Sequence, residues 1–316
     1  EDAAIPMTLK ASMMARLDRL GSAKQIAQVG SVIGREFSYP LIVAISHLSK
    51  DDTDAALARM VKSGLFYQHG TAPEASYQFK DVLVQDAAYE SLLKRRRQQL
   101  HARIATLLEE QFPGTVEFEP ELLAFHWEQG QKVEKAIDYR LRAAGKADRL
   151  CALWEAVTQY LRALELTEQL AETPDTRRKL LATLLSLIVV RGSFWRNATE
   201  ERHGHRYVEK ALAVAREIGD VSAIARIEAF EGTYWANEQL LDDALAHAEA
   251  SGDDATRAEV AMHNAGYLGF AGRFEQSLAH TKRAIRIFEQ LGDQVNLGFA
   301  LAGSARCWSA RAGLLE

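Results

Sequence analysis

Four consecutive cations, Lys94-Arg95-Arg96-Arg97, form the conspicuous charge cluster of this chain. Guanidinium groups bind carboxylates and phosphates through paired N–H donors, so the run is a candidate contact for an acidic neighbouring domain or a phosphate. The same residues also suit a solvated helix face, where alkyl stems cover apolar surface and the charges stay in water. The sequence leaves both interpretations open, and the run is its candidate interaction patch.

Other polar residues have the types needed for chemistry but not the arrangement. His203-Gly204-His205 offers two imidazoles, but we find no cysteine or carboxylate at a metal-ligand spacing and expect a solvated helix turn. The adjacent acids Glu109-Glu110 and Asp242-Asp243 point about 100° apart on a helix and cannot share a proton. His126 and Trp127 lie in an otherwise apolar stretch, so we expect them in the core. The sequence thus predicts no metal site and no catalytic site.

The motifs that enzymes use for nucleotides and zinc are missing from the sequence. G-x-x-x-x-G-K-[ST], G-x-G-x-x-G and H-E-x-x-H do not occur. Because a P-loop needs the first of these, we expect this segment to be non-enzymatic and to hold no cofactor of its own.

Composition excludes several function classes. The 38 lysines and arginines against 43 aspartates and glutamates give a net charge of −5, which argues against broad binding to nucleic acid or anionic membranes. Cys151 and Cys307 lie far apart and form no CxxC motif. The longest apolar run, Leu180–Val190, is shorter than the ~18 residues of a membrane span and predicts a buried helix. We therefore expect a cytoplasmic protein.

The two ends of the sequence predict a piece of a longer protein. The first residues, Glu-Asp-Ala-Ala-Ile-Pro, include neither an initiator Met nor the regions of a signal peptide. At the other end, residues 295–313 are typical of the first helix of a hairpin, and no second helix follows. We expect this last helix to have an uncovered apolar face.

Three segments end in the same way, and a looser fourth copy precedes them. Each has an Ala eight residues before a Gly or its equivalent. Copies 33 to 48 residues apart are typical of helical-hairpin solenoids of the tetratricopeptide kind, in which neighbouring units bury one another's apolar faces. The segments are Ala163-Leu164 to Ala171-Glu172, Ala211-Leu212 to Gly219-Asp220, Ala244-Leu245 to Gly252-Asp253, and Ala284-Ile285 to Gly292-Asp293.

Apolar spacing marks the buried faces of two solenoid helices. Residues at helical intervals are expected to share one face, with small residues beside them that let neighbouring helices approach. The predicted faces are Trp154, Val157, Leu161 and Leu164 in one helix, and Phe274, Leu278, Ile285 and Phe288 in the helix after the turn at Gly272.

The first part of the chain has a different pattern, namely helices followed by a β-ribbon. Helical spacing and capping residues predict helices, and two aromatic runs joined by a Gly-containing loop predict a hairpin. This order is typical of a winged helix. The predicted pieces are helices over 9–20, 22–33, 39–46 and 49–62, a turn at Gly34-Arg35-Glu36-Phe37, and strands over 65–68 and 76–79.

The charge of the predicted recognition helix argues against DNA reading. A DNA-binding winged helix places Arg, Lys, Asn or Gln of the helix before the wing against bases. Here the first turn of that helix carries Asp51, Asp52 and Asp54, which would meet phosphates with carboxylates. We therefore predict a packing module. The alternative is a transcription regulator that binds DNA through this domain, with residues 95–97 on the backbone.

Residues 1–110 also resemble a known family. They are similar to the region downstream of the nucleotide-binding domain in signal-transduction ATPases with numerous domains (STAND), most closely bacterial versions fused to class III adenylate or guanylate cyclase domains. Over the remainder, the resemblance is to tetratricopeptide-like repeats in general. The matching pieces are Met14-Ala15-Arg16-Leu17-Asp18-Arg19-Leu20-Gly21, Ile33-Gly34-Arg35-Glu36-Phe37, Phe79-Lys80 with residues 83–89, and Arg97-Gln98-Gln99-Leu100-His101.

The resemblance implies a separate role for each part of the protein. ATP or ADP would bind an upstream P-loop domain, the winged helix would close over it, and the repeats would sense a partner protein. Many relatives place a phosphate-sensing His after the Phe-Lys pair, where this chain has Asp81. A carboxylate there would repel phosphate, which puts phosphate sensing from this position in doubt.

Together these observations predict an all-α fold with one small β-hairpin. A winged-helix-like regulatory domain would span residues 1–112, and tetratricopeptide-like repeats residues 113–316. The predicted function is non-catalytic: recognition of a protein partner by the repeats, coupled to the nucleotide state of an upstream domain. The DNA-binding regulator remains the alternative.

Overall fold

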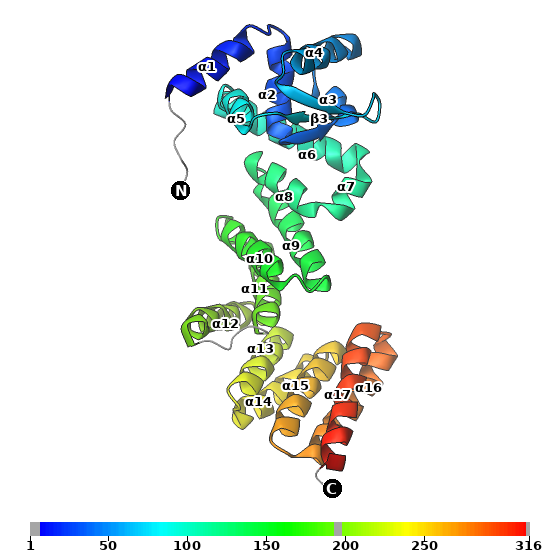
Figure 1. The fold of residues 1–316 in the computed structure, drawn as a ribbon. Coiled ribbons are helices and arrows are strands. Elements are labelled where there is room, and N and C mark those ends of the chain that lie inside the picture. Colours follow the sequence, from blue (N-terminus) through cyan, green and yellow to red (C-terminus); the bar gives the residue numbers. More distant parts are fainter. Residues whose placement is uncertain (1–6, 193–197, 314–316) are drawn as a thin grey trace. The chain divides into compact units, whose positions relative to one another are not determined.

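The computed structural model describes residues 7–192 and 198–313, with side chains over 12–190 and 205–305 (Figure 1). Contacts divide the chain into two compact units, Glu1–Thr167 and Glu168–Glu316. The predicted boundary after residue 112 lies at the joint between two helices of the first unit, and it stays a prediction.

The first unit combines a small sheet with helices. The sheet forms early in the chain, and the last six helices of this unit follow it without further strands. In chain order the elements are α1 (Met7–Asp18), α2 (Ala23–Ile33), β1 (Glu36–Ser38), α3 (Tyr39–Ile45), α4 (Lys50–Lys62), β2 (Phe66–His69), β3 (Ser76–Phe79), α5 (Val82–Glu90), α6 (Lys94–Gln111), α7 (Pro113–Phe118), α8 (Pro120–Gln129), α9 (Val133–Arg149) and α10 (Leu153–Thr167).

The sheet has three antiparallel strands in the order β1-β3-β2, rather than the two predicted. The prediction of a turn over residues 34–37 was wrong, because Glu36–Ser38 pairs with β3, Phe37 lying opposite Tyr77. This strand depends on a long-range partner, and its local sequence of Gly and charged residues indicated a turn. Pairing also places Phe37 in the core.

Aromatic rings fill the core between the sheet and the helices. The ring centroids of Phe37 and Phe66 lie 5.6 Å apart, and those of Phe66 and Phe79 lie 4.7 Å apart, both edge to face. Gly30 of α2 permits this packing, since a Cβ there would lie 2.7 Å from the Phe37 ring. The close approach of helix and sheet therefore requires glycine at this position.

Half-buried charges link the helices that follow. Glu128 of α8 pairs with Arg140 of α9 at 3.0 Å and also with Arg162 of α10. These two guanidinium groups outweigh burial and lower the pKa of the Glu128 carboxyl. One carboxylate thus connects three successive helices.

The second unit is helical throughout its described residues. Helices that follow one another in the chain pack together, including α13 with α14 and α15 with α16. Its elements are α11 (Pro174–Gly192), α12 (Ala198–Ile218), α13 (Val221–Tyr234), α14 (Glu238–Ser251), α15 (Asp254–Phe270), α16 (Phe274–Leu291) and α17 (Gln294–Gly313).

The repeated Gly-Asp pairs form the joints between helices of this unit. Each Gly ends a helix in the left-handed conformation, where a side chain would be strained, and each Asp caps the next helix. The φ angles of Gly219, Gly252 and Gly292 are 73°, 71° and 69°. The carboxylates of Asp220, Asp253 and Asp293 accept from the amides of Ala223 (2.9 Å), Thr256 (3.0 Å) and Asn296 (3.0 Å).

Of the eight residues on the two predicted apolar faces, four are buried and three are half-buried. Leu278 and Phe288 of α16 lie in the core, and Gly272 has the positive φ of a tight turn. Trp154 of α10 is 65% exposed, so its predicted place on the buried face was wrong; the buried stripe of α10 runs through Val157 and Leu164 instead. Within the residues described, no helix combines the length and apolarity that a bilayer crossing requires.

Candidate interaction site at the first turn of α6

The basic run forms the first turn of α6. Lys94, Arg95 and Arg96 are exposed, and Leu93 stands at the N-cap without a side-chain hydrogen bond to the turn. Cations at the positive end of a helix dipole disfavour the helix, and an uncapped end leaves its amides to solvent. The turn therefore carries a local cost in stability.

Arg97 differs from the other three cations because it packs inward. Its guanidinium carbon lies 4.9 Å from the Tyr89 ring centroid, and its Nε is buried without a hydrogen-bond partner in the described part of the chain. This residue therefore contributes packing between α5 and α6, as the solvated-face interpretation allows for an alkyl stem.

Arg96 lines a pocket of about 390 Å³ beside α2 and the α3–α4 connection. The pocket also contains His47 and the amides of Gln25 and Gln28, and no carboxylate lines it. Arg103 adds a further charge, with Nη1 at 2.7 Å from His47 Nε2. Arg103, then burial, then Arg96 lower the pKa of His47. The cluster is thus an uncompensated positive region that favours an anionic partner group.

Asp81 has a local structural role. Its carboxylate caps α5 by accepting from the Leu83 amide at 2.9 Å. Asp is a preferred N-cap residue, which accounts for a carboxylate at this position without any ligand. The expectation that phosphate sensing fails here stays a prediction.

A buried histidine pair lies between α6 and α8. His101 Nδ1 and His126 Nδ1 are 2.9 Å apart, and Tyr89 bonds to His101 Nε2 at 3.1 Å. Burial, assisted by Arg97, lowers the pKa of His101 to about 4, and burial together with His101 lowers that of His126 to about 3. The core placement of His126 and Trp127 is confirmed. The pairing with His101 had no sequence signal, because it joins residues of different helices.

His205 is the described member of the His203-Gly204-His205 group, and the side chain of His203 lies outside the described residues. Two carboxylates stand near it, with Glu209 at 3.4 Å and Glu231 at 3.6 Å. The expectation of no carboxylate at ligand spacing was wrong, since Glu209 lies one helical turn after His205. In the part of the chain with described side chains, no group of three or more His, Cys, Asp or Glu residues is arranged to hold a metal.

Comparison with known proteins gives a partial picture. No protein-family model matches the chain. A protein of Rhizobium meliloti (strain 1021) without an assigned function is 26% identical over 204 residues, covering 64% of this chain and 19% of that protein. The chain thus spans about a fifth of the length of this curated relative.

Two solved structures are also similar. One is a STAND protein with a tetratricopeptide repeat sensor from Pyrococcus horikoshii, with a TM-score of 0.41 and 13% identity over 91% of this chain and 47% of that one. The other is a Rap protein in complex with competence and sporulation factor, with a TM-score of 0.35 and 12% identity over 96% and 99%.

Proposed function

We propose that this chain is a non-catalytic regulatory segment of a bacterial multidomain signalling ATPase or nucleotide cyclase. In this proposal, a winged helix and tetratricopeptide-like repeats couple recognition of a partner protein to an upstream domain that binds ATP or ADP in the cytoplasm. The resemblance of the first 110 residues to STAND proteins supports the placement.

The order of elements in the first unit supports a winged helix. The sequence α2-β1-α3-α4-β2-β3, with β3 between the other strands, matches three helices and a wing. In this arrangement α4 is the helix that a DNA reader would place in the major groove.

The observation that carries the proposal is where this module presents its positive charge. The first turn of α4 exposes Asp51 and Asp52, and the cations Arg59 and Lys62 lie in its last turn, whereas the first turn of α6 exposes Lys94, Arg95 and Arg96 without an acidic residue. A module built to read DNA would have the reverse distribution. The charge distribution favours contact with an acidic protein surface through α6.

Exposed aromatic residues in the second unit support partner recognition by the repeats. Trp235 is 50% exposed at the end of α13, and Phe270 is 94% exposed at the end of α15. Trp235 is the C-cap residue of α13 and Phe270 is the last residue of α15, so both lie at the turn to the next helix. Exposed aromatics are enriched at protein interfaces.

The test is a deletion in the proposed full-length protein. Removing residues 168–316, the second compact unit, leaves the sheet module and α7–α10 intact. We expect a change in nucleotide affinity or turnover, because the repeats would no longer bias the state of the upstream domain. Unchanged affinity and turnover would contradict the proposal.

The alternative function, DNA binding, is favoured by the topology of the module alone. Its test is binding of the 316-residue chain to genomic DNA fragments over a range of salt concentrations. Affinity that falls steeply with salt, as release of counterions requires, would support the alternative and oppose our proposal.

A further inference from the structure

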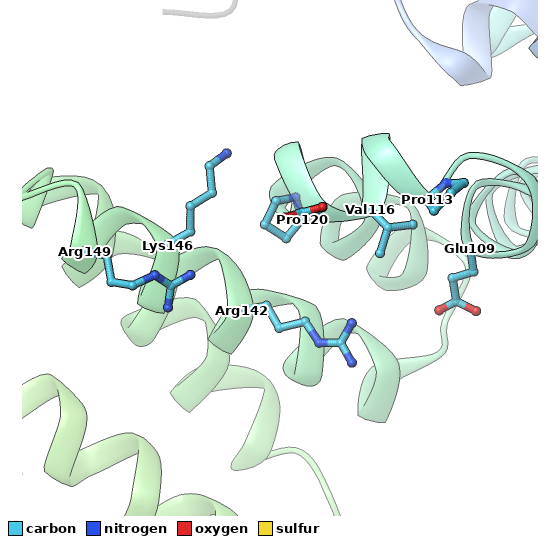
Figure 2. A pocket seen from close by; sticks show the side chains of 8 residues that line it. Glu109, Pro113, Val116, Pro120, Arg142, Lys146 and Arg149 are labelled. Carbon is cyan, nitrogen blue, oxygen red and sulfur yellow. The ribbon is translucent and has the colours of Figure 1, made fainter. Parts of the chain in front are cut away.

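A second cationic site lies in the first unit, near the C-terminal end of α6 and between α7 and α9. Figure 2 shows Arg142, Lys146 and Arg149 along α9, facing Pro113, Val116 and Pro120 across a pocket. The pocket has a volume of about 380 Å³. One wall is therefore basic, and the other is mainly apolar, with Glu117 of α7 as its charged member.

Two of the three cations on the basic wall have no acidic partner. Lys146 lies 3.5 Å from Glu121 and also bonds to the Phe118 carbonyl. Neither Arg142 nor Arg149, in contrast, lies within ion-pair distance of a carboxylate among the described side chains. Arg142 rests 4.8 Å from the Tyr139 ring centroid and also interacts with the Tyr139 phenol.

The carboxylate at the end of the pocket is already compensated. Glu109 accepts from Lys135 at 2.8 Å and from the Trp127 indole at 3.0 Å. Burial, followed by a hydrogen bond to the same carboxylate, raises the pKa of the Tyr139 phenol. Glu109 therefore has partners of its own and also shares the Tyr139 phenol with Arg142, and Glu117 is the other acid that lines the pocket.

The apolar wall is pre-formed. Pro113 begins α7 and Pro120 begins α8. The proline rings restrict the backbone both before and after Val116. A preorganised apolar surface opposite fixed cations selects ligands that are both acidic and apolar.

We infer that this groove binds a peptide segment of the partner protein that combines acidic and apolar residues. Arg142 and Arg149 are seven positions apart on α9, about 10 Å along the axis. An extended peptide covers that distance in about three residues. Two carboxylates so spaced would meet the arginines, and an apolar side chain between them would pack on Val116.

The test uses a fluorescein-labelled peptide, Glu-Leu-Glu-Glu-Leu-Glu, and the 316-residue chain in fluorescence anisotropy. We expect saturable binding that weakens as salt rises, and none for the same peptide with every Glu replaced by Gln. Arg149→Glu and Arg142→Glu should each weaken binding roughly tenfold. Val116→Ser should weaken it less, through loss of apolar contact.

Arg286→Glu is the matched control, because Arg286 is an exposed arginine of α16 and makes the same charge change elsewhere. Equal weakening by Arg286→Glu and Arg149→Glu would overturn the inference, as would absence of peptide binding. Displacement of the peptide by inorganic pyrophosphate with no effect of Val116→Ser would also overturn it, in favour of a phosphate site.

The inference rests on the proposed function insofar as it names the chemistry of the partner. The deletion experiment and the peptide-binding experiment can fail independently of each other. The peptide measurement uses the 316-residue chain and no nucleotide, so coupling in the full-length protein could persist without this groove, and the groove could bind without coupling.

Discussion

The joint before α6 and the Gly-Asp joints of the second unit differ in how the helix that follows is capped. At Gly252-Asp253, a left-handed glycine ends one helix and a carboxylate caps the next. At the start of α6, an exposed Leu93 occupies the cap position, and four cations follow it at the positive end of the dipole. Local signals agree at the first joint and conflict at the second.

We propose that the difference separates residues that serve stability from residues that serve binding. Sequences fold well when local preferences agree with the global structure, and departures from this rule concentrate at functional sites. The repeat joints follow the rule. The first turn of α6 departs from it, and its exposed charges have no compensating role inside the described fold.

The largest expected effect is a loss of stability in the second unit. Leu278 is 8% exposed in α16, so Leu278→Asp places an unpaired carboxylate among apolar neighbours and should cost a few kcal/mol. Thermal melting followed by circular dichroism measures this loss. Gln276→Asp, at an exposed position of the same helix, is the control. An unchanged melt for Leu278→Asp would contradict the assignment of this face.

The next effect concerns the histidine pair that joins α6 to α8. Both pKa values lie below the ordinary 6.5, at about 4 for His101 and about 3 for His126, so the unfolded chain binds protons first. The stability of the fold is therefore undiminished by the pair above pH ~6.5 and declines as pH falls toward 3, by about 2 kcal/mol for each histidine near pH 5.

Urea unfolding at several pH values measures this dependence. The double variant His101→Gln/His126→Gln should lose part of the slope between pH 6.5 and 4. His69→Gln, in an exposed position of β2, should keep it. Identical slopes in the double variant and the unchanged chain would show that the pair does not titrate as described.

A smaller effect tests the joints themselves. Asp253→Ala removes the carboxylate that caps α15 and should lower the free energy of unfolding by about 1 kcal/mol. Asp253→Asn keeps an oxygen acceptor and should recover most of the loss. Equal stability of the Ala and Asn variants would mean that the cap does not stabilise this joint.

The smallest expected effect is a gain in stability, and it concerns the uncapped start of α6. Leu93 is 80% exposed, so Leu93→Ser removes little buried surface and supplies the missing cap of α6. We expect stability to rise by roughly 0.5 kcal/mol, since Ser is a preferred N-cap residue. Denaturant unfolding measures the change. A destabilised variant would contradict the view that α6 begins under a local cost.

Features with local causes could be predicted from the sequence. The joints at Gly219, Gly252 and Gly292 were found because a left-handed glycine and a capping Asp are neighbours in the chain. The strand β3 and the core position of His126 followed in the same way from local pattern.

Features that depend on distant partners could not be predicted. β1 forms because Phe37 pairs with Tyr77 across the sheet, and Trp154 is exposed while Val157, Tyr160 and Leu164 of the same helix are buried. In the candidate site, the sequence identified the charges of residues 94–97. It did not show that Arg96 shares a pocket with His47, or that Arg97 packs on Tyr89.

The most direct measurement is nucleotide turnover of the proposed full-length protein carrying Arg95→Glu and Arg96→Glu, beside the unchanged protein. Both side chains are exposed, so the variant should fold with an unchanged or slightly higher melting temperature. Our account predicts a several-fold change in turnover or nucleotide affinity, because the reversed charge would repel the acidic surface that we propose α6 contacts. Unchanged turnover and affinity in a folded variant would contradict it.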